Sequence, residues 1–381
     1  MSAQAPAPLM TLDVDPLLLD PRTRIVICCG AGGVGKTTTS AALAVRAADA
    51  GRTVVVLTID PARRLAQALG LTTLDNVPRV VEGVGSEAGG RLWAMQLDMK
   101  RTFDEIVEAH STPERSAQIL SNPFYQSLSS SFAGTQEYMA MEKLGQLRVT
   151  GEWDLIIVDT PPSRSALDFL EAPQRMARFL DGKMLRLLVA PAKAGGRAYL
   201  KVVGAGFALF ARILTKILGA QVLTDVSAFV GALDTMFGGF RERAEATYEM
   251  LSQPGTAFLV VASPETDALR EASFFVERLK VDKMPLAGVI VNRVHRSAVP
   301  ELSGQRAEAA AEKLAGMGDQ DLMAAVLNIH AELMYAGRRE SRLISRFRKA
   351  HPDIGLHEVP ALAGDVHDLA ALRAVGAALA G

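Results

Sequence analysis

The segment from Gly30 to Thr37 has the residue types and spacing that bind nucleotide phosphates. It reads Gly-Ala-Gly-Gly-Val-Gly-Lys-Thr and fits the pattern G-x-x-x-x-G-K-[S/T]. Glycines let the backbone curl so that its N–H groups point at phosphate oxygens. We expect Lys36 to bridge the β- and γ-phosphates and the Thr37 hydroxyl to ligate magnesium. The predicted phosphate-binding residues are Gly30, Gly32, Gly33, Val34, Gly35, Lys36, Thr37 and Thr38.

Two aspartates follow apolar runs and are candidates for the acidic half of this site. Asp159 comes directly after the run 155–158, and Asp60 follows the β-branched run 53–58. Ligands bind at the carboxyl ends of parallel strands, so both carboxylates are expected near the phosphates. Asp159 is predicted to hold magnesium, and Asp60 to orient the attacking water. The alternative for Asp60 is a helix N-cap before the proline that follows it. Lys36 and Asp60 are therefore the predicted catalytic residues.

The residues after a third apolar run, 288–291, indicate which base is bound. A GTPase would carry Asn-Lys-x-Asp there, but this chain has Asn292-Arg293-Val294-His295. Without that aspartate, the N1 and N2 donors of guanine lack their acceptor. Adenine is favoured, and Asn292 and Arg293 are predicted nucleotide-binding residues. The predicted ligands are thus ATP or ADP with Mg²⁺.

Continuous apolar runs separated by helical patterns predict the elements that position these residues. Such runs without alternation are typical of strands buried on both faces of a parallel sheet. The fold class is therefore α/β, a doubly wound, mostly parallel sheet of the P-loop type. Residues 1–22 are predicted to be a disordered tail, and 23–381 a single ATPase domain. Helical subdomain insertions are expected at about 100–150 and 175–253. The runs are 25–29, 53–58, 92–97, 155–158, 258–262, 288–291 and 356–359.

Composition limits the classes of partner and compartment. The 381 residues carry a net charge of −1, which gives no general electrostatic case for binding nucleic acid. Cys28 and Cys29 are the two cysteines, and successive strand side chains point to opposite faces, so neither a shared metal nor a disulfide is expected. No zinc site is predicted, because CxxC and His/Cys clusters are missing. A cytoplasmic location is expected, since the start lacks the charge of a signal peptide and no apolar stretch is long enough to span a membrane.

A basic stretch at 182–224 leaves two interpretations open. It holds seven basic residues and no acidic one, with apolar residues at helical spacing among them. One interpretation is a surface for a membrane, a membrane protein or another hydrophobic client, which would make the protein peripheral at the membrane. The other is a core-facing helix with a solvated basic face.

Together these motifs resemble a family that includes the arsenite-pump ATPase (ArsA) and the ATPase that targets tail-anchored membrane proteins. The resemblance implies that Asn292 and Pro360 contact adenine and that Asp60 positions water in an Asp-Pro-Ala switch. It also implies a dimer that closes on ATP and couples hydrolysis to a client or a membrane pump. The segments that carry the resemblance are Cys29–Thr38, Thr58–Ala62, Val158–Pro162, Asp168–Leu170, the strand ending at Asn292, and Val359–Pro360.

The chain departs from this family at Ala31. The family has a lysine there, which reaches across the dimer to the phosphates of the partner. Either a paralogous ATPase subunit supplies the lysine in a heterodimer, or Arg63, Arg64 or Arg164 compensates within a homodimer. The metalloid-binding cysteines of the arsenite pump are missing too, so arsenite is not the expected effector.

Three functions remain beside the leading interpretation of a nucleotide-controlled dimeric ATPase. One is a nucleotide-binding regulatory subunit with weak hydrolysis, which Ala31 favours. Another is a partition or positioning ATPase, although such proteins are shorter and lack long helical insertions. The third is a small-molecule kinase or ligase, which would need a polar pocket near the γ-phosphate.

Overall fold

A computed structural model describes residues 10–60, 62–85, 87–122, 125–126, 135–161, 242–315 and 320–380. Two compact units are present, and each is considered by itself. The first contains the described residues of Met1–Gln96, Glu152–Ala166 and Leu251–Gly381. The second contains those of Leu97–Gly151 and Leu167–Met250.

An eight-stranded sheet forms the centre of the first unit, in the order β3-β4-β2-β5-β1-β6-β7-β8. Every pair is parallel except β3 with β4, which is antiparallel. The predicted fold class is therefore confirmed. The strands are β1 (Ile25–Gly30), β2 (Thr53–Thr58), β3 (Arg79–Val80), β4 (Arg91–Gln96), β5 (Leu155–Asp159), β6 (Thr256–Ala262), β7 (Leu286–Val294) and β8 (Leu356–Pro360).

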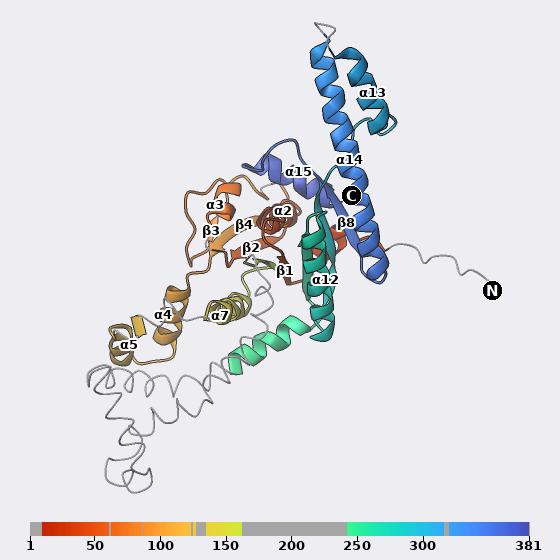
Figure 1. Cartoon of the computed structure of the whole chain (residues 1–381). Coiled ribbons are helices and arrows are strands. Elements are labelled where there is room, and N and C mark those ends of the chain that lie inside the picture. The colour runs from red at the N-terminus through yellow and green to blue at the C-terminus, as the bar shows by residue number, and fades with distance from the viewer. Residues whose placement is uncertain are drawn as a thin grey trace, which may run out of the picture. The chain divides into compact units, whose positions relative to one another are not determined.

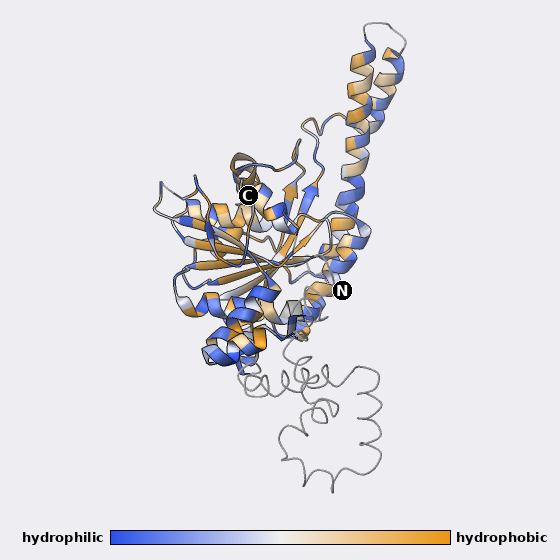
Figure 2. Cartoon of the chain, turned by 90° about the vertical axis from the view of Figure 1, so that its left-hand side faces the viewer, coloured by the Kyte–Doolittle hydropathy of each residue, from blue (hydrophilic) through white to orange (hydrophobic). Residues whose placement is uncertain are grey.

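Helices cover both faces of this sheet, which explains why its central strands β1, β5 and β6 are buried and almost wholly apolar (Figure 2). On one face α2 (Lys36–Asp49) packs against the strands and against α15 (Leu369–Ala380), with Val26 and Cys28 in the same core. The other face is covered by α12 (Thr266–Val281), which contacts β1, β6 and β7 (Figure 1). Cys28 and Cys29 are both buried and unbonded to each other, as their alternation along β1 predicts.

Residues 10–22 correct part of the predicted disordered tail, whereas residues 1–9 lie outside the described residues. Residues Val14–Leu19 form helix α1, capped by the carboxylate of Asp13, which accepts a hydrogen bond from the backbone N–H of Asp15. Leu12 and Leu18 are buried in the same core as α2 and α15. The Ala- and Pro-rich beginning predicts disorder. Apolar side chains further along the segment nevertheless pack on the sheet domain, and their burial offsets the entropy cost of ordering the chain.

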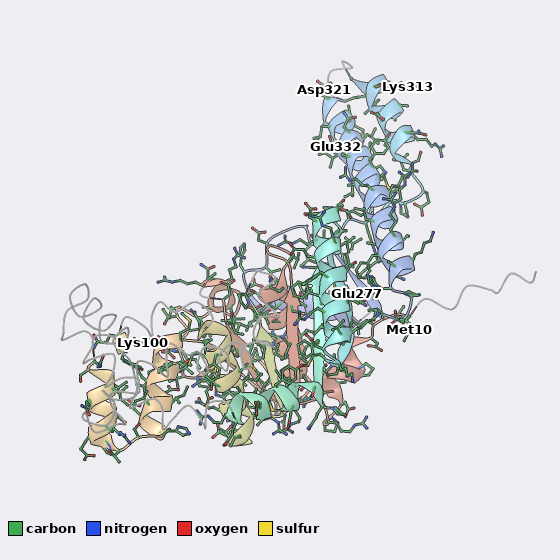
Figure 3. All side chains as sticks on the ribbon, turned by 60° about the horizontal axis from the view of Figure 1, so that its bottom comes forward. Met10, Lys100, Glu277, Lys313, Asp321 and Glu332 are labelled. Atoms are coloured by element: carbon green, nitrogen blue, oxygen red, sulfur yellow. The ribbon has the colours of Figure 1, made fainter. Side chains whose placement is uncertain are left out.

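A helical hairpin that the sequence analysis did not anticipate extends from the first unit. It consists of α13 (Gly304–Leu314) and the 30-residue α14 (Asp321–Ala350). Small residues let the two helices pack closely, with Ala307 and Ala311 of α13 and Ala331 of α14 buried. Figure 1 shows the hairpin projecting beyond the sheet, and Figure 3 labels Lys313, Asp321 and Glu332 on it. Several apolar side chains of α14 are nonetheless exposed, namely Leu322, Met323, Val326 and Ile329.

The second unit is helical where the structure describes it. Its helices are α4 (Met99–Ala109), α5 (Pro113–Leu120), α7 (Thr135–Thr150) and a helical stretch at 242–250. The buried Glu142 accepts a hydrogen bond from Arg243 over 2.8 Å, which joins two of these helices. The basic stretch 182–224 and most of the expected insertion 175–253 lie outside the described residues, so the inserted subdomain stays a prediction. Of the helices that are described, none is long and apolar enough to cross a bilayer.

Candidate functional site

The glycine-rich loop joins β1 to α2 at the carboxyl edge of the sheet. Gly30 and Gly35 both have positive φ angles, of 147° and 94°. A Cβ at Gly30 would lie 2.0 Å from the Val261 carbonyl oxygen, and one at Gly35 would lie 2.3 Å from the Asn292 side-chain nitrogen. Only glycine fits at these two positions. Among the described residues no side chain caps the start of α2, so its first N–H groups are available to an anion.

Lys36 is buried within the curl of this loop. Its ammonium donates to the carbonyl oxygens of Gly30 at 3.0 Å and Ala31 at 2.7 Å. Burial lowers the pKa of Lys36, while the Asp159 carboxylate opposes this change. The loop therefore holds a cation at its centre, as a site for phosphate requires.

Asp159, at the end of β5, is fully buried and is held by two hydroxyls. Its Oδ2 accepts hydrogen bonds from Thr37 over 2.8 Å and from Thr58 over 2.9 Å. Burial raises the pKa of Asp159 to about 6, although the two hydroxyls and Lys36 lower it. The structure thus brings both predicted magnesium ligands, Thr37 and Asp159, into direct contact.

The second oxygen of Asp159, Oδ1, is buried and has no hydrogen-bond partner among the described residues. A buried carboxylate oxygen in that state is costly unless another group satisfies it. Magnesium prefers carboxylate, hydroxyl and water oxygens, which is the donor set that Asp159 and Thr37 offer. The residues present therefore fit a magnesium ion bound through Thr37 and, directly or through water, Asp159.

Asp60 lies in the loop after β2 and lines the same cavity as Lys36. Its Oδ1 accepts a hydrogen bond from the Ala62 backbone N–H over 3.0 Å. The next helix, α3 (Arg64–Ala68), is preceded by Arg63 at its N-cap. Asp60 therefore stabilises a local turn instead of capping a helix, so the alternative reading of Asp60 is wrong.

Asn292 and Arg293, at the end of β7, both bond to the phosphate-binding loop. The Asn292 amide donates to the Val34 carbonyl oxygen, and the Arg293 guanidinium to that of Gly33, each over 3.0 Å. Arg293 has a φ of 61°, which is uncommon outside glycine, and the pairing of β7 with β8 shifts register at this point. Such a bulge re-aims side chains, and here two consecutive residues contact the loop.

A cavity of about 990 Å³ is lined by Lys36, Thr37 and Asp60 together with Asn292 and Arg293. Its wall includes Pro360 and the loop that follows it, at 361–367. The predicted residues on this wall are Gly33, Gly35, Lys36, Thr37, Thr38, Asp60, Asn292, Arg293 and Pro360, whereas Gly30, Gly32, Val34 and Asp159 are not on it.

Three residues of this region were missed by sequence reasoning. Thr58 contacts Asp159, as described above. His295 lines the cavity and is fixed by Glu340 of α14, whose carboxylate accepts from the His295 backbone N–H over 2.8 Å and lies 2.7 Å from its Nδ1. Glu340 is distant in sequence and carries no motif, so nothing in the sequence could have revealed it. Thr58 lies two positions before the Asp-Pro-Ala motif and could have been proposed from that position.

The cations considered as substitutes for a lysine at Ala31 have different positions. Arg64 lines the cavity, and Arg63 is exposed beside it. Arg164 and the segment Asp168–Leu170 lie outside the described residues. Ala31 itself is buried in the core beside α2.

Comparison with known proteins assigns the chain to a family. A family model described as anion-transporting ATPase matches residues 23–315. The protein named ATPase GET3 of Malassezia globosa is 30% identical over 164 residues, which are 43% of this chain and 46% of that protein. An ATPase ASNA1 homolog of Babesia bovis is 25% identical over 286 residues, or 74% of this chain and 69% of the relative. ATPase GET3 of Podospora anserina is 24% identical over 280 residues, covering 73% and 75%.

The chain thus matches less than half the length of the first relative and about three quarters of the last. The family model covers well over half of the 381 residues. The chain therefore belongs to the anion-transporting ATPase family.

Proposed function

We propose that this chain binds MgATP and hydrolyses it to ADP and phosphate. One observation supports this most directly: the hydroxyl of Thr37 donates to the buried Asp159 carboxylate beside the loop that holds Lys36. These groups supply a cation for the transferring phosphate and oxygen ligands for a divalent metal. Bound magnesium would neutralise charge that develops on the β- and γ-phosphate oxygens.

Each predicted residue has a task that its position supports. Lys36 exchanges the loop carbonyls for phosphate oxygens, and the free N–H groups at the start of α2 bind the phosphates. Asn292, Arg293 and Pro360 line the cavity and bind the nucleotide, with Asn292 and Pro360 at the base. Asp60 faces the same cavity and orients the attacking water. Adenine is the proposed base, because the aspartate that would accept the guanine donors is missing.

The proposal includes a dimer whose nucleotide state controls a surface for a hydrophobic client or a membrane protein in the cytoplasm. Its support is the family, together with two relatives whose names identify them as ATPase GET3 and an ASNA1 homolog. The dimer is either a homodimer or a heterodimer with a paralogous subunit.

A second candidate is a regulatory subunit that binds nucleotide but hydrolyses it weakly. It is favoured by Ala31, whose methyl side chain is packed in the core where the family carries a lysine. Loss of a cation at the transferring phosphate lowers rates by orders of magnitude, as it does for arginine fingers.

The experiment measures MgATP turnover by the purified chain while its mass in solution is recorded. Lys36→Ala is the blank, because it removes the phosphate-binding cation. We expect turnover that needs Mg²⁺ and a mass corresponding to a dimer. Binding without turnover would select the regulatory subunit, and the chain should then be mixed with a paralogous subunit to restore hydrolysis. If the chain does not bind MgATP at all, the proposed function is wrong.

A further inference from the structure

The hydroxyl of Thr58 links the Asp159 carboxylate to the backbone N–H of Asp60. Thr58 is the last residue of β2 and is 1% exposed. Its Oγ1 lies 2.9 Å from Asp159 Oδ2 and 3.2 Å from the backbone nitrogen of Asp60. No other described side chain is hydrogen-bonded both to Asp159 and to the backbone of Asp60.

The direction of these two bonds follows from the hydroxyl having one proton. The Asp60 carbonyl oxygen is also near, but at 3.5 Å it is much further from Oγ1 than the carboxylate. Bonds to a charged acceptor are stronger than bonds to a neutral one, so the proton is donated to Asp159. A lone pair of the same oxygen then accepts the Asp60 N–H. Thr58 is thus donor to one carboxylate and acceptor for the backbone of the other residue.

This arrangement fixes the orientation of the Asp159 carboxylate. Thr37 and Thr58 both donate to Oδ2, which turns Oδ1 away as the unpartnered oxygen. A second link, from the Ile59 N–H to the Asp159 carbonyl oxygen over 2.9 Å, ties the same backbone segment to β5. Because a β-branched side chain is stiff at χ1, the Thr58 hydroxyl is held in place by the strand.

We propose that Thr58 is a positioning residue of the ATPase site, which holds the Asp159 carboxylate towards magnesium and keeps Asp60 in register with it. The inference rests on the proposed function, because the two carboxylates are assigned to the metal and to the attacking water. Thr58 does not line the cavity, and its hydroxyl is engaged by Asp159 and the Asp60 backbone, so it acts through these two residues.

The test compares Thr58→Val, which keeps the shape but removes the hydroxyl, with Thr58→Ser, which keeps the hydroxyl. Thr58→Ala is made in parallel in case the valine variant does not fold. The matched control is Thr256→Val, because Thr256 is a buried threonine at the start of β6, at the opposite edge of the sheet from the end of β2. For each folded variant, kcat, the KM for ATP and the Mg²⁺ concentration for half-maximal turnover are measured.

Thr58→Val or Thr58→Ala should lower kcat about tenfold or more and raise the half-saturating Mg²⁺ concentration, because a bond to a charged group is lost. The KM for ATP should change by less than about threefold, since binding of the base and phosphates is not touched. Thr58→Ser should recover most of kcat and of the Mg²⁺ response. Thr256→Val should behave as the unchanged protein.

The inference is overturned if the hydroxyl-free variants match the unchanged protein, or if Thr58→Ser loses as much as they do. Should the unchanged protein bind a fluorescent ATP analogue without hydrolysing it, the same comparison is made on the Mg²⁺ dependence of binding. If the unchanged protein binds no nucleotide, the proposed function itself is contradicted. That result is obtained before any Thr58 variant is measured.

Discussion

Ala31 is the residue at which the chain departs most from the chemistry of the proposed site. Its side chain lies in the core, and its carbonyl oxygen accepts a hydrogen bond from Lys36. The loop therefore uses this position for packing, and its side chain supplies no charge to a phosphate.

Substituting Ala31 by lysine should raise the turnover of the chain alone. A cation at the transferring phosphate is worth about 10³- to 10⁵-fold in related phosphoryl transfers, so even a poorly placed lysine should give about tenfold. Ala31→Met is the matched control, since it adds similar length without charge. Steady-state MgATP hydrolysis gives the answer, and equal rates for the lysine and methionine variants would contradict this reasoning.

The raised pKa of Asp159 predicts a pH dependence of stability when magnesium is absent. The pKa is about 6 in the folded protein against an ordinary value of 3.8, so the folded state binds the proton more tightly than the unfolded state. The resulting stabilisation is complete below pH ~3.8 and is lost as pH rises through about 6, which amounts to roughly 3 kcal/mol.

Urea unfolding between pH 4.5 and pH 7 in the presence of a chelator measures this effect. The free energy of unfolding of the unchanged protein should fall relative to that of Asp159→Asn, whose amide does not titrate. Excess Mg²⁺ should reduce the difference, because the metal favours the ionised carboxylate. Parallel pH profiles for the two proteins would show that Asp159 is not responsible.

At the scale of elements, helix α14 is fastened to the end of β7 by one buried side chain. Glu340 accepts from the His295 backbone N–H and lies within hydrogen-bond distance of its ring. A Cβ at Gly337 would lie only 3.0 Å from the His295 carbonyl oxygen, so the helix passes directly over this strand end.

Glu340→Ala should lower the free energy of unfolding by about 2 kcal/mol, because the hydrogen bond from the His295 N–H to a buried carboxylate is lost. The same substitution at the exposed Glu332, nearer the N-terminal end of α14, should change the free energy of unfolding by less than about 0.5 kcal/mol. Chemical denaturation of the two variants and the unchanged protein tests this. Equal losses for Glu332→Ala and Glu340→Ala would contradict it.

The elements that the sequence predicted are those with a strong local signal. Seven apolar runs became strands because burial on both faces requires continuous apolar sequence. The two-residue β3 has exposed side chains and gave no such run. The α13–α14 hairpin was missed because its contacts are made by alanines, which carry little periodic contrast, while larger apolar residues such as Leu322 and Ile329 stay exposed.

The candidate site shows the same difference between residues with a local sequence signal and residues without one. The loop from Gly30 to Thr37 follows a spacing that phosphate imposes, so it could be read from the sequence. Asp60 and Asp159 could be proposed because each ends an apolar run. The hydrogen bonds of Thr58 and of Glu340 depend on which strands and helices become neighbours in space, and a single sequence does not specify those pairings.

At the scale of the whole molecule, the described residues of the proposed site all belong to the first unit. MgATP should therefore stabilise this unit by mass action, by about 2.7 kcal/mol when its concentration is 100 times the dissociation constant. Slow backbone hydrogen exchange in β1, α2 and β7 should become slower still.

Hydrogen exchange with and without MgATP, read by mass spectrometry over the whole chain, measures this protection. Lys36→Ala is the control and should show no change at the same nucleotide concentration. Protection confined to α4, α5 and α7 of the second unit would place the nucleotide elsewhere and contradict the assignment.

The place at which α14 is fastened has a mechanical consequence. From Glu340 to the N-terminal end of the helix at Asp321 the rise is about 28 Å at ~1.5 Å per residue. A rotation of about 5° about that anchor would therefore carry the end of the helix through about 2.5 Å. The anchor is bonded to His295, a residue of the cavity wall, so one continuous helix connects the cavity wall with the exposed apolar residues near Asp321.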